Sequence, residues 1–153
     1  MDKGIYCLVL AGGGVPVRIG ALGELFFQSG YYVYTGSALG PGGIPARVGR
    51  HIRTAVTPGS KIHWHIDYLL RDPSFRLVAA YCAETEERME CNVAGAVGGE
   101  GMVKFGCSDC SCSSHLFFFP HYPGPEIVQA LGKLGLVWNK RTLLKDPGTS
   151  VIS

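Results

Sequence analysis

Charged residues and long hydrophobic runs are both scarce in this chain of 153 residues. Asp, Glu, Lys and Arg make up 17% of it, against about 25% in an average domain. Its apolar stretches are interrupted by Gly, Ser or Arg well before about 18 residues, the length that spans a membrane. The sequence therefore predicts no membrane segment and no membrane partner.

The first residues also lack a secretory signal, which is a charged segment followed by an apolar run and a small-residue cleavage site. We therefore expect a cytoplasmic protein with reduced thiols. In that compartment the 6 cysteines suggest metal binding or chance before disulfides. Cys7, Cys82 and Cys91 are interpreted as ordinary buried cysteines.

Internal repeats are absent, and so is the Gly-x-x-x-x-Gly-Lys-Ser/Thr loop that cradles nucleoside triphosphates. Hydrophobic residues make up 46% of the chain, which excludes global disorder. A chain of this length is one domain's worth and can bury a full core. We expect the domain over residues 1–143, with 144–153 as a frayed tail.

Glycine is plentiful, and charge is unevenly distributed along the chain. The 22 glycines are about twice the average frequency and predict many tight turns. Residues 1–76 carry 8 basic and 4 acidic residues, whereas residues 77–153 carry 6 and 8. The first half is therefore the candidate surface for an anionic partner.

Apolar and β-branched runs bounded by glycine predict strands over Gly4–Leu10, Gly30–Gly36 and Phe75–Cys82. A further hairpin is expected over Val15–Ile19 and Leu25–Gln28. Short strands are expected over Val103–Phe105 and Leu116–Phe119, around a cysteine-rich turn in a segment spanning 105–119.

Three helices are expected between these strands. Pro45 suits the first turn of a helix that ends at Thr57, with Val48 and Ile52 on its apolar face and Arg47 and His51 off that face. The others are His63–Arg71 and a helix capped by Thr85 that runs to Val97, followed by a loop at Gly98–Gly101. These elements predict an α+β fold with a small mixed or antiparallel central sheet flanked by helices.

Two triplets, Gly4-Ile5-Tyr6 and Tyr34-Thr35-Gly36, are followed by Arg47 on the next helix and Glu90 on a later one. This ordered set resembles the GIY-YIG nuclease superfamily. Thr35 stands where that superfamily has Ile, and 28 residues separate Tyr6 from Tyr34. The connection must therefore hold extra structure, the expected hairpin.

A wider pattern resembles a small branch of that superfamily, found free-standing or fused to DNA-repair glycosylases of the endonuclease III type. It consists of Gly36-Ser-Ala-Leu-Gly40, His63-Trp-His-Ile-Asp67-Tyr-Leu-Leu and Gly106-Cys-Ser-Asp-Cys-Ser-Cys-Ser-Ser-His115. The resemblance implies a GIY-YIG-like domain, with DNA as the main partner, RNA as an alternative, and a DNA-repair protein as a possible further partner.

The resemblance also implies roles for the matching residues. Tyr6 or Tyr34 would orient or deprotonate the attacking water, and Arg47 would neutralise the phosphate. Glu90 would hold Mg²⁺ or Mn²⁺, since a hard cation prefers carboxylate oxygen. The alternatives are tyrosines that pack a core, a surface arginine and a solvated helix glutamate. His51 would donate to the phosphate or move a proton, or serve in capping and packing.

Several residues are candidates for holding nucleic acid. Arg50 and Arg53 suit contacts to the phosphate backbone. Gly36 and Ser37 open a glycine-rich loop that lets backbone approach a ligand or simply turns the chain. His63, His65 and Asp67 would share one face of a strand and could bind metal there, but on the favoured helix His65 points away. Structural hydrogen bonding, substrate contact and metal binding all stay open for them.

Cys107, Cys110, Cys112 and His115 have the donor types and number of a structural Zn²⁺ site. Packing beside the nuclease site and a reactive thiol are the alternatives. The resemblance therefore implies a metal-dependent endonuclease that hydrolyses DNA phosphodiester bonds in repair or branched intermediates. The alternatives are a non-catalytic nucleic-acid-binding module and a zinc- or iron-binding structural protein that acts through partners.

Overall fold

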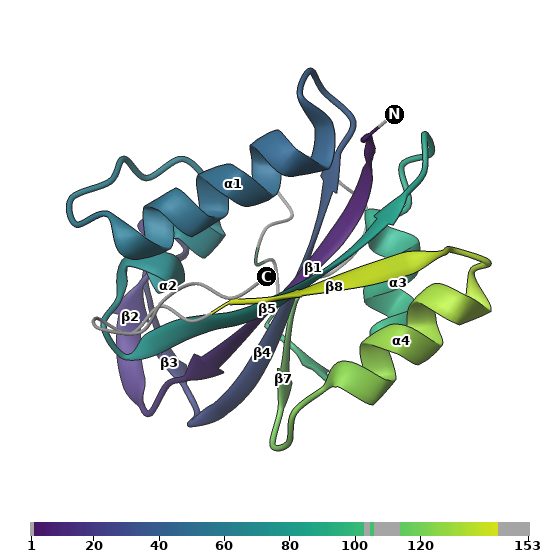
Figure 1. Ribbon diagram of the computed structural model, residues 1–153. Helices are drawn as coiled ribbons and strands as arrows, with labels where there is room; N and C mark the ends of the chain where they lie inside the picture. Colours follow the sequence, from purple (N-terminus) through teal and green to yellow (C-terminus); the bar gives the residue numbers. More distant parts are fainter. Residues whose placement is uncertain (1, 103–104, 106–113, 144–153) are drawn as a thin grey trace.

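A computed structural model describes residues 2–102, 105 and 114–143. A six-stranded sheet with the order β6-β7-β4-β1-β5-β8 runs through its centre (Figure 1). Every neighbouring pair is antiparallel, so the α+β prediction is confirmed and the sheet is not mixed. The strands are β1 (Gly4–Gly12), β4 (Gly30–Ala38), β5 (Phe75–Glu84), β6 (Glu100–Gly101), β7 (Leu116–Phe119) and β8 (Trp138–Thr142).

Strand β1 is buried on both sides because helices cover both faces of the sheet. Its alternate side chains enter two separate hydrophobic clusters, with Tyr6 and Leu8 in one and Ile5 and Cys7 in the other. The near-continuous apolar run of β1 follows from this double burial.

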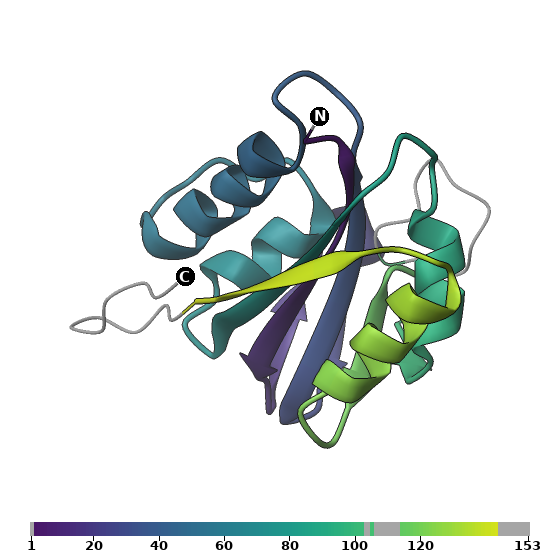
Figure 2. The same cartoon turned by 45° about the vertical axis from the view of Figure 1, so that its right-hand side comes forward.

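Helices α1 (Gly43–Val56) and α2 (His65–Arg71) cover one face, and α3 (Glu90–Val97) and α4 (Gly124–Lys133) cover the other (Figure 2). We call these the α1 face and the α3 face. In the described part of the chain, no helix combines the length and apolar character needed to cross a bilayer.

The connection between β1 and β4 contains the predicted hairpin. Strands β2 (Val15–Arg18) and β3 (Glu24–Phe27) form a separate two-stranded sheet, joined through the short helix η1 (Gly20–Leu22). Val17 and Phe27 of this hairpin pack into the cluster on the α1 face. The extra residues therefore extend the core and leave β1 and β4 free to pair.

Three local predictions are wrong. Helix α3 begins at Glu90 with Met89 as its N-cap, because the Thr85 hydroxyl accepts the Glu87 N–H within a turn. The Gly98–Gly101 segment is a loop only over its first half, since β6 pairs with β7. Of the strand predicted over Val103–Phe105, Phe105 lies in a turn, and residues 103–104 lie outside the described residues.

Helix α4 and strand β8 are absent from the sequence prediction. Helix α4 is amphipathic, and its Ile127 and Leu131 are buried on the α3 face. Strand β8, Trp-Asn-Lys-Arg-Thr, is exposed at all 5 residues and lacks apolar alternation. It forms because the edge of β5 offers unpaired backbone groups, with Tyr81 opposite Lys140.

Candidate functional site

The pairing of β1 with β4 places the two sequence triplets side by side. Tyr6 lies opposite Gly36, and its ring covers that glycine. A Cβ on Gly36 would lie 2.5 Å from the Tyr6 hydroxyl and from its Cζ atom. A Cβ on Gly4 would collide with the Ala83 carbonyl of β5. The sheet therefore has no room for a side chain at Gly4 or at Gly36.

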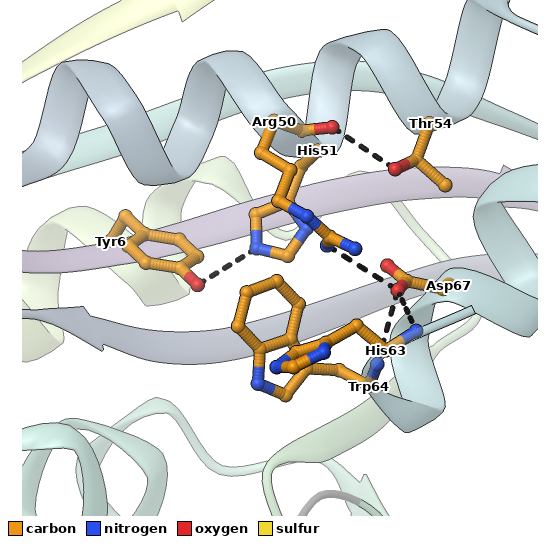
Figure 3. Close-up of polar contacts among 7 residues, drawn as sticks. All are labelled: Tyr6, Arg50, His51, Thr54, His63, Trp64 and Asp67. Carbon is orange, nitrogen blue, oxygen red and sulfur yellow. Dashed lines mark hydrogen bonds and ion pairs between the residues drawn. The ribbon is translucent and has the colours of Figure 1, made fainter. Parts of the chain in front are cut away.

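The Tyr6 hydroxyl lies 2.8 Å from Nε2 of His51, which reaches it from α1 (Figure 3). Both side chains are almost fully buried. Burial lowers the pKa of His51 to about 4, so its imidazole is neutral at pH 7. Burial also raises the pKa of Tyr6, and the nearby Arg47 guanidinium opposes that rise only in part. The pair is therefore a neutral phenol beside a neutral imidazole.

Trp64 joins two arginines above this pair. The Cζ atoms of Arg47 and Arg50 lie 4.7 and 4.4 Å from the centroid of the Trp64 ring, within the range of cation–π attraction. Arg47 also donates from Nη1 to the Ser37 carbonyl at 3.0 Å. Each guanidinium carries five N–H donors, so the donors that remain beside these contacts suit phosphate oxygens.

Asp67 is fully buried at the start of α2 and fixes the segment that carries Trp64. Its Oδ2 atom accepts the backbone N–H groups of His63 at 2.7 Å and Trp64 at 3.0 Å. The same oxygen lies 3.4 Å from Nη1 of Arg50 (Figure 3). One carboxylate thus begins the helix and positions an arginine.

Tyr34 borders the cluster on the side nearer to β7. Its ring centroid lies 6.2 Å from that of His51 and 6.5 Å from that of His115. His115 is held by backbone bonds to Thr35 and Phe105. Tyr34 therefore connects the α1 face with the open edge of β4 beyond β7.

Glu90 lies on the other layer of the molecule. It begins α3, which packs on the α3 face, and its Oε2 accepts from Nη2 of Arg88 at 3.1 Å. The Oε1 atom is buried and has no hydrogen-bond partner within the described residues. The next residue, Cys91, has its Sγ 3.7 Å from Nε2 of His115. Glu90 is therefore linked to Tyr34 by a chain of contacts around the edge of the sheet.

A basic groove of about 400 Å³ adjoins the cluster at the end of α1. Arg50 is shared between the two. We call this the α1 groove, and its lining consists of cationic and hydroxyl side chains: Arg50, Arg53, Thr54, Thr57, Ser60 and Lys61. This chemistry suits phosphate groups, since it offers positive charge and donors but no acidic side chain.

The family described as Domain of unknown function DUF123 matches residues 5–135 of this sequence. The chain belongs to this family. No curated protein and no solved structure matches the chain. In this DUF123 domain the matched span begins at Ile5 of the first triplet and ends just after α4. It therefore includes every residue of the cluster around Tyr6.

The DUF123 domain brings together most of the predicted catalytic residues. Tyr6, Tyr34, Arg47 and His51 meet on the α1 face, but Glu90 does not join them directly. The prediction that His51 lies off the apolar face of its helix is wrong, because its imidazole is buried alongside Val48. The helical pattern placed His51 on the exposed side because its side chain is polar. Its hydrogen bond to the Tyr6 hydroxyl instead satisfies Nε2 inside the core.

The residues predicted to hold nucleic acid lie in different places in the structure. Gly36 is covered by Tyr6, Ser37 holds Arg47 through its carbonyl, and Arg50 and Arg53 line the α1 groove. Helix α2 begins at His65, two residues later than predicted. His63 is exposed beside Trp64, and the His65 ring lies 5.5 Å from that of Phe105. In the described residues, no group of three or more His, Cys, Asp or Glu is arranged as a metal site.

Only some of the cysteines for which roles are predicted lie within the described residues. Cys107, Cys110 and Cys112 lie outside the described residues, and His115 lies inside them. Cys7 and Cys82 are free and buried as predicted. Cys91 is disulfide-bonded, so its assignment as an ordinary buried cysteine is wrong. Its partner is neither Cys7 nor Cys82, because both are free.

Sequence reasoning missed Trp64, which contacts both arginines and His51. The signal that could have found it is Asp67, an acidic residue in the first turn of α2. An acid at that position commonly accepts backbone N–H groups before the helix. It therefore fixes the backbone of the preceding residue and the direction of its side chain.

Proposed function

We propose that this DUF123 domain is a metal-dependent endonuclease of the GIY-YIG superfamily that hydrolyses DNA phosphodiester bonds, in repair or branched intermediates. The observation that carries the proposal is the buried Tyr6 hydroxyl, 2.8 Å from Nε2 of His51 and flanked by the two arginines stacked on Trp64. Hydrolysis needs a proton acceptor for water and positive charge around the phosphate. The cluster supplies both.

The protonation states favour a relay over a phenolate base. Because burial raises the pKa of Tyr6, a standing phenolate is disfavoured at pH 7. The attacking water gives its proton to the Tyr6 oxygen while the Tyr6 hydroxyl gives its own to Nε2 of His51. The hydroxide oxygen bonds to phosphorus, the bond from phosphorus to the leaving oxygen breaks, and that oxygen takes a proton from water. His51 then returns its proton through the Tyr6 oxygen to water.

Arg47 and Arg50 have the role of stabilising the negative charge that develops on the phosphate. Trp64 and the Ser37 carbonyl hold Arg47, and Asp67 holds Arg50. Groups fixed in advance stabilise a transition state better than mobile ones, because they need no reorganisation during the reaction. Substrate phosphates on either side of the scissile bond would lie along the α1 groove.

Glu90 fits Mg²⁺ or Mn²⁺ through its Oε1 atom, a buried carboxylate oxygen without a hydrogen-bond partner in the described residues. One carboxylate is enough for such a cation when water and phosphate oxygens complete its shell. When bound, the metal would supply positive charge and acidify water on the Tyr34 side of the cluster, to which Glu90 is linked through Cys91 and His115.

A nuclease assay with Mg²⁺ or Mn²⁺ tests the function, using labelled nicked, flapped, abasic and four-way-junction DNA with matched RNA. We expect Tyr6→Phe and His51→Gln to lose about 10²–10⁴-fold in rate, and Arg47→Ala about 10²–10³-fold. Glu90→Ala should abolish the metal-dependent product. Tyr31→Phe is the matched control, since Tyr31 packs against Tyr122 and not in the cluster. Full activity of Glu90→Ala would overturn the assignment.

The α1 groove favours a second candidate, a nucleic-acid-binding module that does not cleave. Its three cations bind phosphates whether or not a bond is broken. Salt-sensitive binding with no metal-dependent product on any substrate would favour this candidate. Failure to bind DNA or RNA at low salt would contradict both.

A further inference from the structure

His51 uses only one of its two ring nitrogens. Nε2 meets the Tyr6 hydroxyl, whereas Nδ1 is buried and has no hydrogen-bond partner within the described residues. A neutral imidazole carries its proton on one nitrogen and a lone pair on the other. If Nε2 is to accept a proton from Tyr6, the proton of His51 must be on Nδ1.

Asp67 also has one carboxylate oxygen without a hydrogen-bond partner among the described residues. Its Oδ2 accepts from the backbone of His63 and Trp64 and pairs with Arg50, but the fully buried Oδ1 has no partner in the described part of the chain. A buried carboxylate oxygen without a donor is costly. Figure 3 shows the Asp67 carboxylate on the side of the His51 ring that carries Nδ1.

The charges around His51 identify Asp67 as the opposing group. Arg47 and Arg50 on the same helix disfavour a positive imidazole, whereas Asp67 from α2 favours it. Among the described residues, Tyr6 from β1 and Tyr34 from β4 are the other titratable groups in contact with the ring. Within these described surroundings, Asp67 is the negative group that acts on the ring.

We propose that Asp67 is a positioning residue that holds His51 as its Nδ1–H tautomer, so that Nε2 is the acceptor for the Tyr6 proton. Nδ1 and Oδ1 are not hydrogen-bonded to each other, so Asp67 acts on the ring through its charge. In the buried interior, which has a low dielectric constant, that charge favours a proton on Nδ1, the ring nitrogen on the side of the carboxylate. The tautomer of His51 is a property of the resting protein and does not depend on any activity. The catalytic consequence rests on the proposed nuclease function.

In the proposed reaction, Asp67 would act on the proton transfer from Tyr6 to His51. When Nε2 takes the Tyr6 proton, His51 becomes a buried imidazolium beside two arginines. Asp67 then offsets the new positive charge without itself taking the proton. Without Asp67 the imidazolium is less stable, and the ring is free to adopt the tautomer whose Nε2–H cannot accept.

Nuclear magnetic resonance of the full chain with ¹⁵N-labelled histidine tests the tautomer directly. Long-range proton–nitrogen correlations distinguish a protonated ring nitrogen from an unprotonated one. The His51 signals are assigned by their loss in His51→Gln. In the wild type at pH 7 we expect Nδ1–H to exceed Nε2–H by about tenfold or more, the ratio that one pKa unit of differential interaction provides.

Asp67→Asn should shift His51 towards Nε2–H by about tenfold or more, since the amide oxygen can still accept the His63 and Trp64 N–H groups but the charge is lost. Asp72→Asn, the same change at the other end of α2, is the control and should leave the tautomer unchanged. An Nε2–H tautomer in the wild type overturns the proposal, even if Asp67→Asn fails to fold. An unchanged ratio in folded Asp67→Asn also overturns it.

The nuclease assay separates this inference from the proposed function. An Nδ1–H tautomer that depends on Asp67, in a protein that cleaves nothing, supports the inference and contradicts the function. Cleavage with the opposite tautomer contradicts the inference alone.

Discussion

At the scale of single residues, Thr35 is a polar side chain placed in the core. It is fully buried, and its Oγ1 has no hydrogen-bond partner within the described residues. Thr35→Val keeps the shape and removes the unsatisfied hydroxyl, so we expect the free energy of unfolding to rise by about 1 kcal/mol. Chemical denaturation measures this change.

Thr54→Val is the matched control for that prediction. The Thr54 hydroxyl donates to the Arg50 carbonyl at 3.0 Å, so the same substitution removes a hydrogen bond there. We expect no stabilisation from it. A loss of stability in Thr35→Val would mean that the hydroxyl has a partner in solution.

His51 makes the stability of the domain depend on pH. Its pKa falls from 6.5 in the unfolded chain to about 4 in the folded one, because burial disfavours the charged ring. Between these values the unfolded state binds more protons, so stability is full above about pH 6.5 and declines as pH falls towards 4. The decline from this group is about 3 kcal/mol.

Denaturation series between pH 7 and pH 4 test the sign. His51→Gln should be less stable at pH 7 and should lose less stability towards pH 4 than the wild type does. His121→Gln is the control, since His121 is exposed and pairs with Glu126 at the surface. A wild-type stability that stays constant or rises on acidification would contradict the buried neutral imidazole.

At the scale of elements, α1 serves two surfaces at once. Its inward residues Val48 and His51 pack on the sheet, while Arg47 and Arg50 flank the cluster and Arg53 turns to the α1 groove. A helix places residues three and four apart on neighbouring positions of one side. The helix therefore connects the proposed chemistry to the proposed binding surface.

Salt dependence of DNA binding tests the groove. Arg53→Gln and Lys61→Gln should each weaken binding across all sequences and reduce the slope of log K against log[salt] by about 0.7–0.9. Their cleavage rate at saturating DNA should change little. Lys133→Gln, an exposed change on α4 at the other face, is the control. Unchanged slopes in both groove variants would place the phosphates elsewhere.

At the scale of the whole molecule, one sheet is shared by two hydrophobic cores. Leu8 belongs to the core on the α1 face and Ile127 to the core on the α3 face. Because β1 contributes to both, neither core can come apart without exposing the other. We therefore expect a single cooperative unfolding transition.

Trp64 and Trp138 report on the two faces separately, since Trp64 packs with His51 and Trp138 with Tyr81. Trp64→Phe and Trp138→Phe leave one fluorophore each, and both should report the same midpoint as circular dichroism. Leu8→Ala and Ile127→Ala should each lower that shared midpoint, at a cost of about 2–5 kcal/mol. Separate midpoints for the two fluorophores would mean independent cores.

Strong local patterns allowed much of the fold to be predicted from the sequence. The apolar runs predicted β1, β4 and β5, and the gap between Tyr6 and Tyr34 correctly required the β2–β3 hairpin. The start of α3 and all of β8 escaped prediction. The Thr85 hydroxyl accepts a hydrogen bond within a turn and does not cap the helix. Strand β8 forms because it pairs with the edge of β5, and its own residues carry no strand pattern.

The candidate site could likewise be predicted only in part from the sequence. The glycine triplets and Arg47 are local signals, so the candidate residues around Tyr6 could be named from the sequence. Only the tertiary structure decided that the Tyr6 hydroxyl meets His51, that Trp64 stacks both arginines, and that Glu90 lies on the other layer. These contacts join residues from separate elements, and their distances are set by how the helices pack on the sheet.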